Sequence, residues 1–166
     1  MGEKSEVLKE AIKHKGFFTY SEVYNFCYNW IKDEGYNVSE KKYEEKISSF
    51  GKEILIEWEA KKKISDYFRN IISMKWHILG MNDAEVEING KKEKTNKGEV
   101  KITIAAELES DYEKSWEKNP WWKFLRGTYD KYIIRTTKEA YEDRLQSKAE
   151  SYVENVKSFL RLEGKK

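Results

Sequence analysis

The sequence predicts an α+β domain: a four- to five-stranded antiparallel meander sheet, with an N-terminal helix and a long C-terminal helical segment covering its apolar face. Two observations lead to this class. Apolar and charged side chains alternate through much of residues 43–109, which is the period of strands with one buried face. Near both ends of the chain the apolar positions recur every three or four residues, which is the period of a helix. The 166 residues show no internal repeat and no linker, so we expect a single domain spanning residues 1–166.

The first predicted helix spans residues 20–34 and follows a polar lead-in at residues 1–16, which we interpret as a frayed helix. Thr19 and Glu22 have the spacing of a capping box, and Gly35 stands where a left-handed cap ends many helices. One apolar stripe recurs at three- and four-residue steps: Val23, Phe26, Cys27, Trp30 and Ile31. This stripe predicts a helix that buries one face.

Residues 43–109 predict the sheet. Alternation is clearest at residues 54–60, 68–78 and 100–108, and residues 43–50 supply one further strand. Asn89-Gly90 is a two-residue hairpin signal, because both residues accept a positive φ. The amide of Asn70 breaks the pattern, since it would fall on the apolar side of its strand.

Residues 120–162 predict the helical segment that covers the sheet. Asn119 and Pro120 suit its start, since Asn caps helices and Pro favours the first turn. A 3.6-residue period then runs through Tyr141, Leu145, Ala149, Tyr152, Val156, Phe159 and Leu160. An unbroken helix would be longer than a domain of this size can cover alone, so we expect a break near Gly127 or residues 136–137 unless the protein dimerises through this helix.

The composition excludes several kinds of chemistry. The chain has two His and one Cys, too few for a zinc site, and it lacks the motifs of a phosphate-binding loop or a hydrolase nucleophile. Cys27 lies on the apolar stripe and is interpreted as a buried thiol, while His77 is interpreted as a surface residue near Glu57 or Glu107. The sequence therefore assigns no catalytic residue, no metal ligand and no cofactor, and nothing in it indicates an enzyme.

The charge, the cysteine content and the hydropathy of the chain bear on its partners and on its location in the cell. The net charge is +2, from 32 basic and 30 acidic residues, so the strong positive charge of a dedicated nucleic-acid binder is absent. The many Lys and Glu residues are also typical of thermophile surfaces. A lone Cys, a charged N-terminus and no apolar run of membrane-spanning length favour a cytoplasmic location.

The aromatic stretch after Pro120 carries the leading functional hypothesis. On a helix, its apolar side chains, among them Trp121, Trp122, Phe124 and Tyr129, form an arc too wide for burial against one sheet. Arg126 lies among them and is the fifth candidate interface residue. The arc fits the protein's own core, a protein interface or a membrane surface, and nearby acidic residues argue against the membrane. Interface anchors are enriched in Trp, Tyr and Arg. We therefore expect a non-enzymatic interaction or assembly module that binds a protein partner or itself.

Two other functions remain open. The layout of sheet and long C-terminal helix is that of several ligand-cavity folds, an analogy of fold only. A cavity lined by Trp58, Phe68, Trp76 and Tyr152 would hold a small molecule or a lipid. A weaker alternative is a nucleic-acid accessory protein that uses Lys-rich strand ends at Lys61, Lys62, Lys63, Lys91 and Lys92. Lysines at strand ends also serve simply to discourage sheet-to-sheet pairing.

Overall fold

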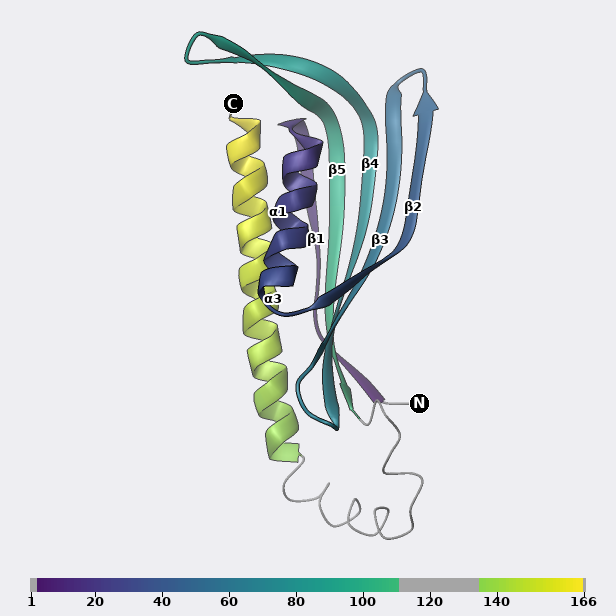
Figure 1. Cartoon of the computed structure of the whole chain (residues 1–166), viewed down its shortest axis with the longest axis vertical. Coiled ribbons are helices and arrows are strands. Elements are labelled where there is room, and N and C mark those ends of the chain that lie inside the picture. Colours follow the sequence, from purple (N-terminus) through teal and green to yellow (C-terminus); the bar gives the residue numbers. More distant parts are fainter. Residues whose placement is uncertain (1–2, 111–134, 166) are drawn as a thin grey trace.

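The computed structural model describes residues 3–110 and 135–165, and within them it shows the predicted α+β class. An antiparallel five-stranded sheet has the order β1-β5-β4-β3-β2 (Figure 1). The strands are β1 (Glu3–Phe18), β2 (Asn37–Ser48), β3 (Gly51–Lys63), β4 (Phe68–Ile88) and β5 (Lys91–Ser110). The helices are α1 (Tyr20–Asp33) and α3 (Arg135–Gly164). Strands β2 to β5 form the expected meander, and α1 matches the predicted helix at residues 20–34.

The lead-in predicted at residues 1–16 is wrong, because this segment forms the edge strand β1. It pairs with β5 from Glu3 opposite Ser110 to Phe18 opposite Asn96. Leu8, Ile12 and Phe18 are buried on one face. Polar residues between them on that face, such as Glu10, interrupt the alternation that identifies a strand in the sequence. Glu10 instead forms an ion pair with Lys157 of α3, at 3.6 Å.

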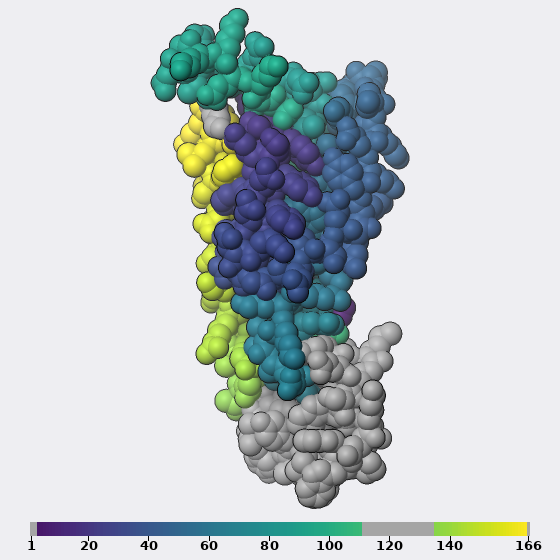
Figure 2. All heavy atoms as spheres, viewed as in Figure 1, coloured from purple at the N-terminus to yellow at the C-terminus, as the bar shows by residue number. Residues whose placement is uncertain are grey.

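The two helices cover one face of the sheet and contact each other through aromatic rings. Phe26 of α1 stacks on Phe159 of α3, and Trp30 stacks on Tyr152, both with ring centroids 4.4 Å apart. The Tyr152 hydroxyl donates a hydrogen bond to the Cys27 carbonyl at 2.9 Å. Figure 2 shows α1 packed between α3 and the β2–β3 hairpin, below the β4–β5 hairpin. The part of the predicted helical segment at residues 120–134 lies outside the described residues.

Three glycines allow the sheet to bend. A Cβ atom on Gly98 of β5 would lie 2.9 Å from the Met81 Cα, and one on Gly51 would lie 2.8 Å from the Gly80 carbonyl carbon. Register shifts occur in the same region of β3 and β4. Beyond this bend, the long β4–β5 hairpin curves over the helices (Figure 1) and closes at Asn89-Gly90, as predicted, with φ of 53° and 79°.

The start of α1 is stabilised by distant residues and not by the predicted capping box. Thr19 makes no side-chain cap; its hydroxyl hydrogen bonds to the Thr95 hydroxyl at 3.0 Å. The Tyr20 N–H donates to Asn96 Oδ1 at 2.9 Å, and the Thr19 N–H donates to Glu163 Oε2 at 3.3 Å. The amides of Thr19 and Tyr20 at the helix start are therefore satisfied by α3 and β5. At the other end, Gly35 has φ of +92°, which agrees with the predicted left-handed cap.

Candidate functional site

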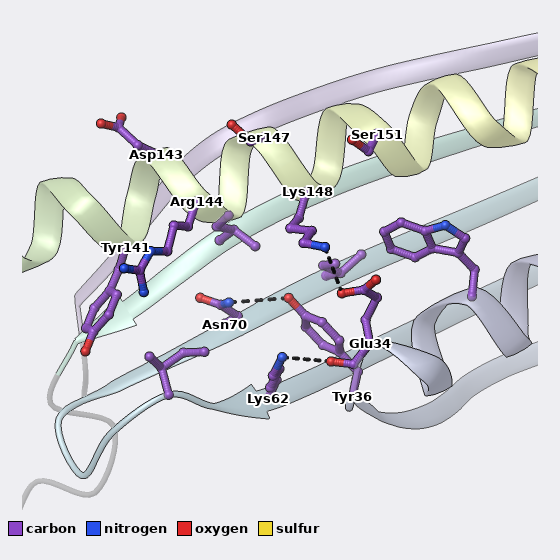
Figure 3. A pocket seen from close by; sticks show the side chains of 14 residues that line it. Glu34, Tyr36, Lys62, Asn70, Tyr141, Asp143, Arg144, Ser147, Lys148 and Ser151 are labelled. Atoms are coloured by element: carbon purple, nitrogen blue, oxygen red, sulfur yellow. Dashed lines mark hydrogen bonds and ion pairs between the residues drawn. The ribbon is translucent and has the colours of Figure 1, made fainter.

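A pocket of about 580 Å³ lies between α3, the C-terminal end of α1 and the adjoining ends of β3 and β4 (Figure 3). Its volume is in the range typical of small-molecule sites. It is lined by Trp30, Glu34, Tyr36, Lys62, Ile64, Asn70, Ile72, Tyr141, Asp143, Arg144, Leu145, Ser147, Lys148 and Ser151. The pocket thus lies between the sheet and the C-terminal helix, where the cavity hypothesis placed it.

The local chain path explains the position of the pocket. After the cap at Gly35, the chain turns towards β2 and buries Tyr36, which is 6% exposed. The β3–β4 connection is a tight turn in which the Ile64 and Ser65 amides both donate to the Phe68 carbonyl at 3.1 Å. The end of α1 and this turn therefore lie beside α3 and leave a space with an apolar base.

Two cations of the pocket, Lys62 and Lys148, contact Glu34 at the C-terminal end of α1. The Lys148 amine forms an ion pair with the Glu34 carboxylate at 3.4 Å. The Lys62 amine donates to the Glu34 carbonyl at 2.8 Å and lies 5.7 Å from the centre of the Tyr36 ring. Among the described residues, its charge is therefore met by the dipole of the Glu34 carbonyl and by the face of the Tyr36 ring, and not by a carboxylate.

Arg144 is a cation with no hydrogen bond or ion pair to any other described residue. Figure 3 shows its guanidinium directed from α3 towards the strands, whereas neighbouring Asp143 points away from the pocket. The inward-facing charged groups are then Lys62, Arg144 and Lys148 against the single carboxylate of Glu34. This balance favours a negatively charged group in the pocket.

Asn70 supplies an unpaired polar group at the base of the pocket. Its Nδ2 donates to the Tyr36 hydroxyl at 3.4 Å, while its buried Oδ1 accepts no hydrogen bond from the described residues. Exchanging the two ends of the amide would leave the nitrogen unpaired instead, so one polar atom is unpaired either way. Burial raises the pKa of Tyr36, which keeps its hydroxyl protonated and neutral. A buried unpaired amide is costly and indicates a role.

The four residues predicted to line a cavity lie in the core instead. Trp58, Phe68, Trp76 and Tyr152 are each at most 3% exposed. None of them is among the residues that line the pocket. The Trp58 and Trp76 rings are 5.4 Å apart and both contact Tyr24 of α1. Apolar alternation therefore identified the core, whereas the pocket wall is made of residues nearer its edge.

The residues of the leading hypothesis, namely Trp121, Trp122, Phe124, Arg126 and Tyr129, all lie outside the described residues. Self-association through them stays a prediction.

The lysine clusters do not form one basic patch. Lys61, Lys62 and Lys63 end β3 beside the start of β4, whereas Lys91 and Lys92 follow the turn at the far end of that long strand. Opposite ends of the sheet therefore carry them (Figure 1). Lys61 pairs with Glu59 at 3.1 Å and Lys63 with Asp66 at 3.0 Å, which reduces the charge of the first cluster.

Cys27 and His77, the cysteine and the histidine considered in the sequence analysis, are respectively buried and in contact with a glutamate. Cys27 is fully buried, and burial raises the pKa of its thiol to about 12, so the thiol is neutral near pH 7. His77 contacts Glu53 at 3.0 Å and not the predicted Glu57 or Glu107. Leu55 is the residue that pairs with His77, and Glu53 reaches the histidine from two residues earlier in β3, next to the register shift between Lys52 and Ile54.

Comparison of the chain with protein-family models, with curated proteins and with solved structures gives no match. Neither described helix combines the length and the apolar character needed to span a bilayer. In residues 3–110 and 135–165, no group of three His, Cys, Asp or Glu side chains is placed to hold a metal ion.

One signal for the pocket was present in the sequence. Asn70 interrupts the apolar face of its strand, and a polar residue in that position predicts either a buried hydrogen bond or a site. Arg144 and Lys148 carried no such signal, because a charged residue on an amphipathic helix normally faces solvent. Only the position of α3 relative to the end of α1 brings these cations to the pocket.

Proposed function

We propose that the protein binds a small amphipathic anion in the pocket between α1, α3 and the β3–β4 turn. The observation that carries this proposal is the combination, in one pocket, of an apolar wall, inward-facing cations and the unpaired amide of Asn70. A small-molecule site usually has this composition: mostly apolar, with few polar groups that fix orientation.

The arrangement suits a ligand with two parts. Trp30, Ile64, Ile72, Tyr141 and Leu145 would contact an aromatic or aliphatic body. Arg144 would pair with a carboxylate, sulfonate or phosphate group, since its planar guanidinium presents several donors at once. Asn70 would bond to a hydroxyl or an amine deeper in the pocket. The proposal involves no covalent step.

The test uses 8-anilinonaphthalene-1-sulfonate, an aromatic sulfonate whose fluorescence rises on binding. We expect saturable binding by the wild-type chain and about tenfold weaker binding by Arg144→Ala, since a charge-assisted hydrogen bond contributes about 1.4 kcal/mol or more. Ser151→Trp, at an exposed position of the pocket wall, should block the site sterically.

Arg161→Ala is the matched control, because Arg161 is also exposed on α3 but bonds to Ser158 outside the pocket. It should bind the dye like the wild type. If Arg144→Ala and Ser151→Trp both bind with wild-type affinity, the dye uses another surface, and the proposed site is wrong.

A further inference from the structure

Strand β2 has no strand partner on its outer edge among residues 3–110 and 135–165. It is the last strand in the order β1-β5-β4-β3-β2. Residues 39–48 are all exposed, on both faces of the strand. Figures 1 and 2 show no described element beyond this edge. A row of backbone N–H and C=O groups without strand partners is a template for another strand.

The charges along this edge are antisymmetric about one residue. Reading outwards from Tyr43, Lys42 stands against Glu44, Lys41 against Glu45, and Glu40 against Lys46. Within residues 40–46, any two residues at the same distance from Tyr43, one before it and one after it, carry opposite charges. A strand with this property is complementary to itself when it is reversed.

Reversal is what a two-fold axis produces. Two copies of β2 that pair antiparallel about Tyr43 place Lys42 opposite Glu44, Lys41 opposite Glu45 and the two Tyr43 rings opposite each other. Glu40 adds no such pair, because the register shift at Lys41 turns it to the face of Trp58, where it accepts hydrogen bonds from Trp58 and Tyr24. Opposite charges and aromatic pairs facing across strands each contribute about 0.2–1 kcal/mol. A two-fold interface uses the same surface on both subunits, so each contact between two different residues occurs twice.

The same charges disfavour other registers. A slip of one residue in one direction places Lys41 opposite Lys46. A slip of two places Lys42 or Glu44 opposite itself. Like charges directly opposite are destabilising. Lysines on an edge strand usually discourage pairing with any other strand. Here they would disfavour the shifted registers and allow the one register centred on Tyr43.

The conformation of β2 is compatible with this pairing. The register shift opposite β3 occurs at Lys41, so Lys42, Tyr43 and Glu44 at the centre are regular. Lys42 and Glu44 now contact each other along the strand at 3.8 Å, and Glu45 contacts Lys52 at 3.2 Å. These pairs are exposed and weak, so exchanging them for cross-strand pairs costs little. Tyr43 is 44% exposed; its hydroxyl accepts a hydrogen bond from Tyr20 at 3.3 Å and donates one to Glu45 at 3.4 Å, and both bonds are exposed.

We propose that β2 pairs with β2 of a second copy about Tyr43, which joins the two sheets edge to edge. The proposal does not depend on the ligand pocket, which lies between α3, the C-terminal end of α1 and the adjoining ends of β3 and β4. It also names a surface different from residues 121–129, so the two routes to self-association can be separated by mutation.

The test is the solution mass of the full chain, measured by light scattering. We expect a wild-type dimer. The double variants Lys41→Glu/Lys42→Glu and Glu44→Lys/Glu45→Lys should each be monomeric, because like charges then face each other across the axis. Mixing the two variants should restore a dimer, since each acidic strand then faces a basic one. All four residues are exposed, so the fold should survive.

Lys91→Glu/Lys92→Glu makes the same charge change at the far hairpin and should stay dimeric. A monomeric wild type, a dimeric Lys41→Glu/Lys42→Glu variant, or a mixture that fails to associate would each overturn the proposal. Dissociation by Trp122→Ala, with Lys41→Glu/Lys42→Glu still dimeric, would assign the interface to the aromatic stretch instead.

Discussion

The buried thiol of Cys27 makes a specific prediction about alkaline stability. Its side chain is completely buried on α1, and burial raises the pKa from an ordinary 9.0 to about 12. Between these two values the unfolded chain has lost the thiol proton while the folded chain retains it. The unfolded state therefore binds fewer protons, and the free energy of unfolding falls as the pH rises.

The magnitude follows from the two pKa values. At pH 7 the thiol is protonated in both states and contributes nothing to the pH dependence. At pH 10 it is mostly ionised in the unfolded chain alone, which stabilises the unfolded state by about 1.4 kcal/mol. Burial also raises the pKa values of the tyrosines Tyr24 and Tyr152, which steepens the decline at higher pH.

The assay is urea unfolding at pH 7 and pH 10, for the wild type and for Cys27→Ala. Alanine leaves a small cavity whose cost is the same at both pH values, so it cancels in the comparison. Burial is the largest cause of the raised tyrosine pKa values and is common to both proteins, so most of the tyrosine contribution cancels; the smaller effect of Cys27 on the pKa of Tyr152 does not. We expect the wild type to lose about 1.4 kcal/mol more than the variant between the two pH values. Equal losses would refute the assignment of a neutral, desolvated thiol to the folded state.

Two further changes test the packing that positions the site. Tyr152→Phe removes the hydroxyl that bonds to the Cys27 carbonyl but keeps the ring, and it should cost about 1 kcal/mol, or about 2–4 °C in Tm. An unchanged unfolding midpoint would show that this hydrogen bond is not needed. Gly98→Ala places a Cβ atom 2.9 Å from the Met81 Cα and should destabilise by about 1–3 kcal/mol, measured by the same unfolding assay. Wild-type stability in this variant would mean that the strands are not in close contact at the bend.

The elements predicted correctly are those whose cause is local. The stripe through Val23, Cys27 and Ile31 marks α1, and these three residues are its buried ones. Asn89-Gly90 closes the β4–β5 hairpin because both positions need a positive φ. Periodicity of side chains and turn chemistry are properties of a few consecutive residues, so the sequence displays them directly.

The elements missed are those whose cause lies far away in the chain. Strand β1 forms because β5 offers it a partner, although its own pattern is interrupted by polar residues that contact α3. The start of α1 is satisfied by Asn96 and Glu163, more than seventy residues away along the chain. The spacing of Thr19 and Glu22 cannot show that Glu163 and Asn96 bind the amides of Thr19 and Tyr20.

The pocket shows the same division. The sequence by itself determined an amphipathic helix, a sheet with one apolar face and a polar Asn70 on that face, because these depend on spacing alone. Only the tertiary structure decided that Arg144 and Lys148 of α3 lie beside Glu34 and Asn70, since that depends on how two helices pack across a bent sheet. The charge pattern of β2 was likewise in the sequence, but its meaning required the structure to show that β2 is a free edge.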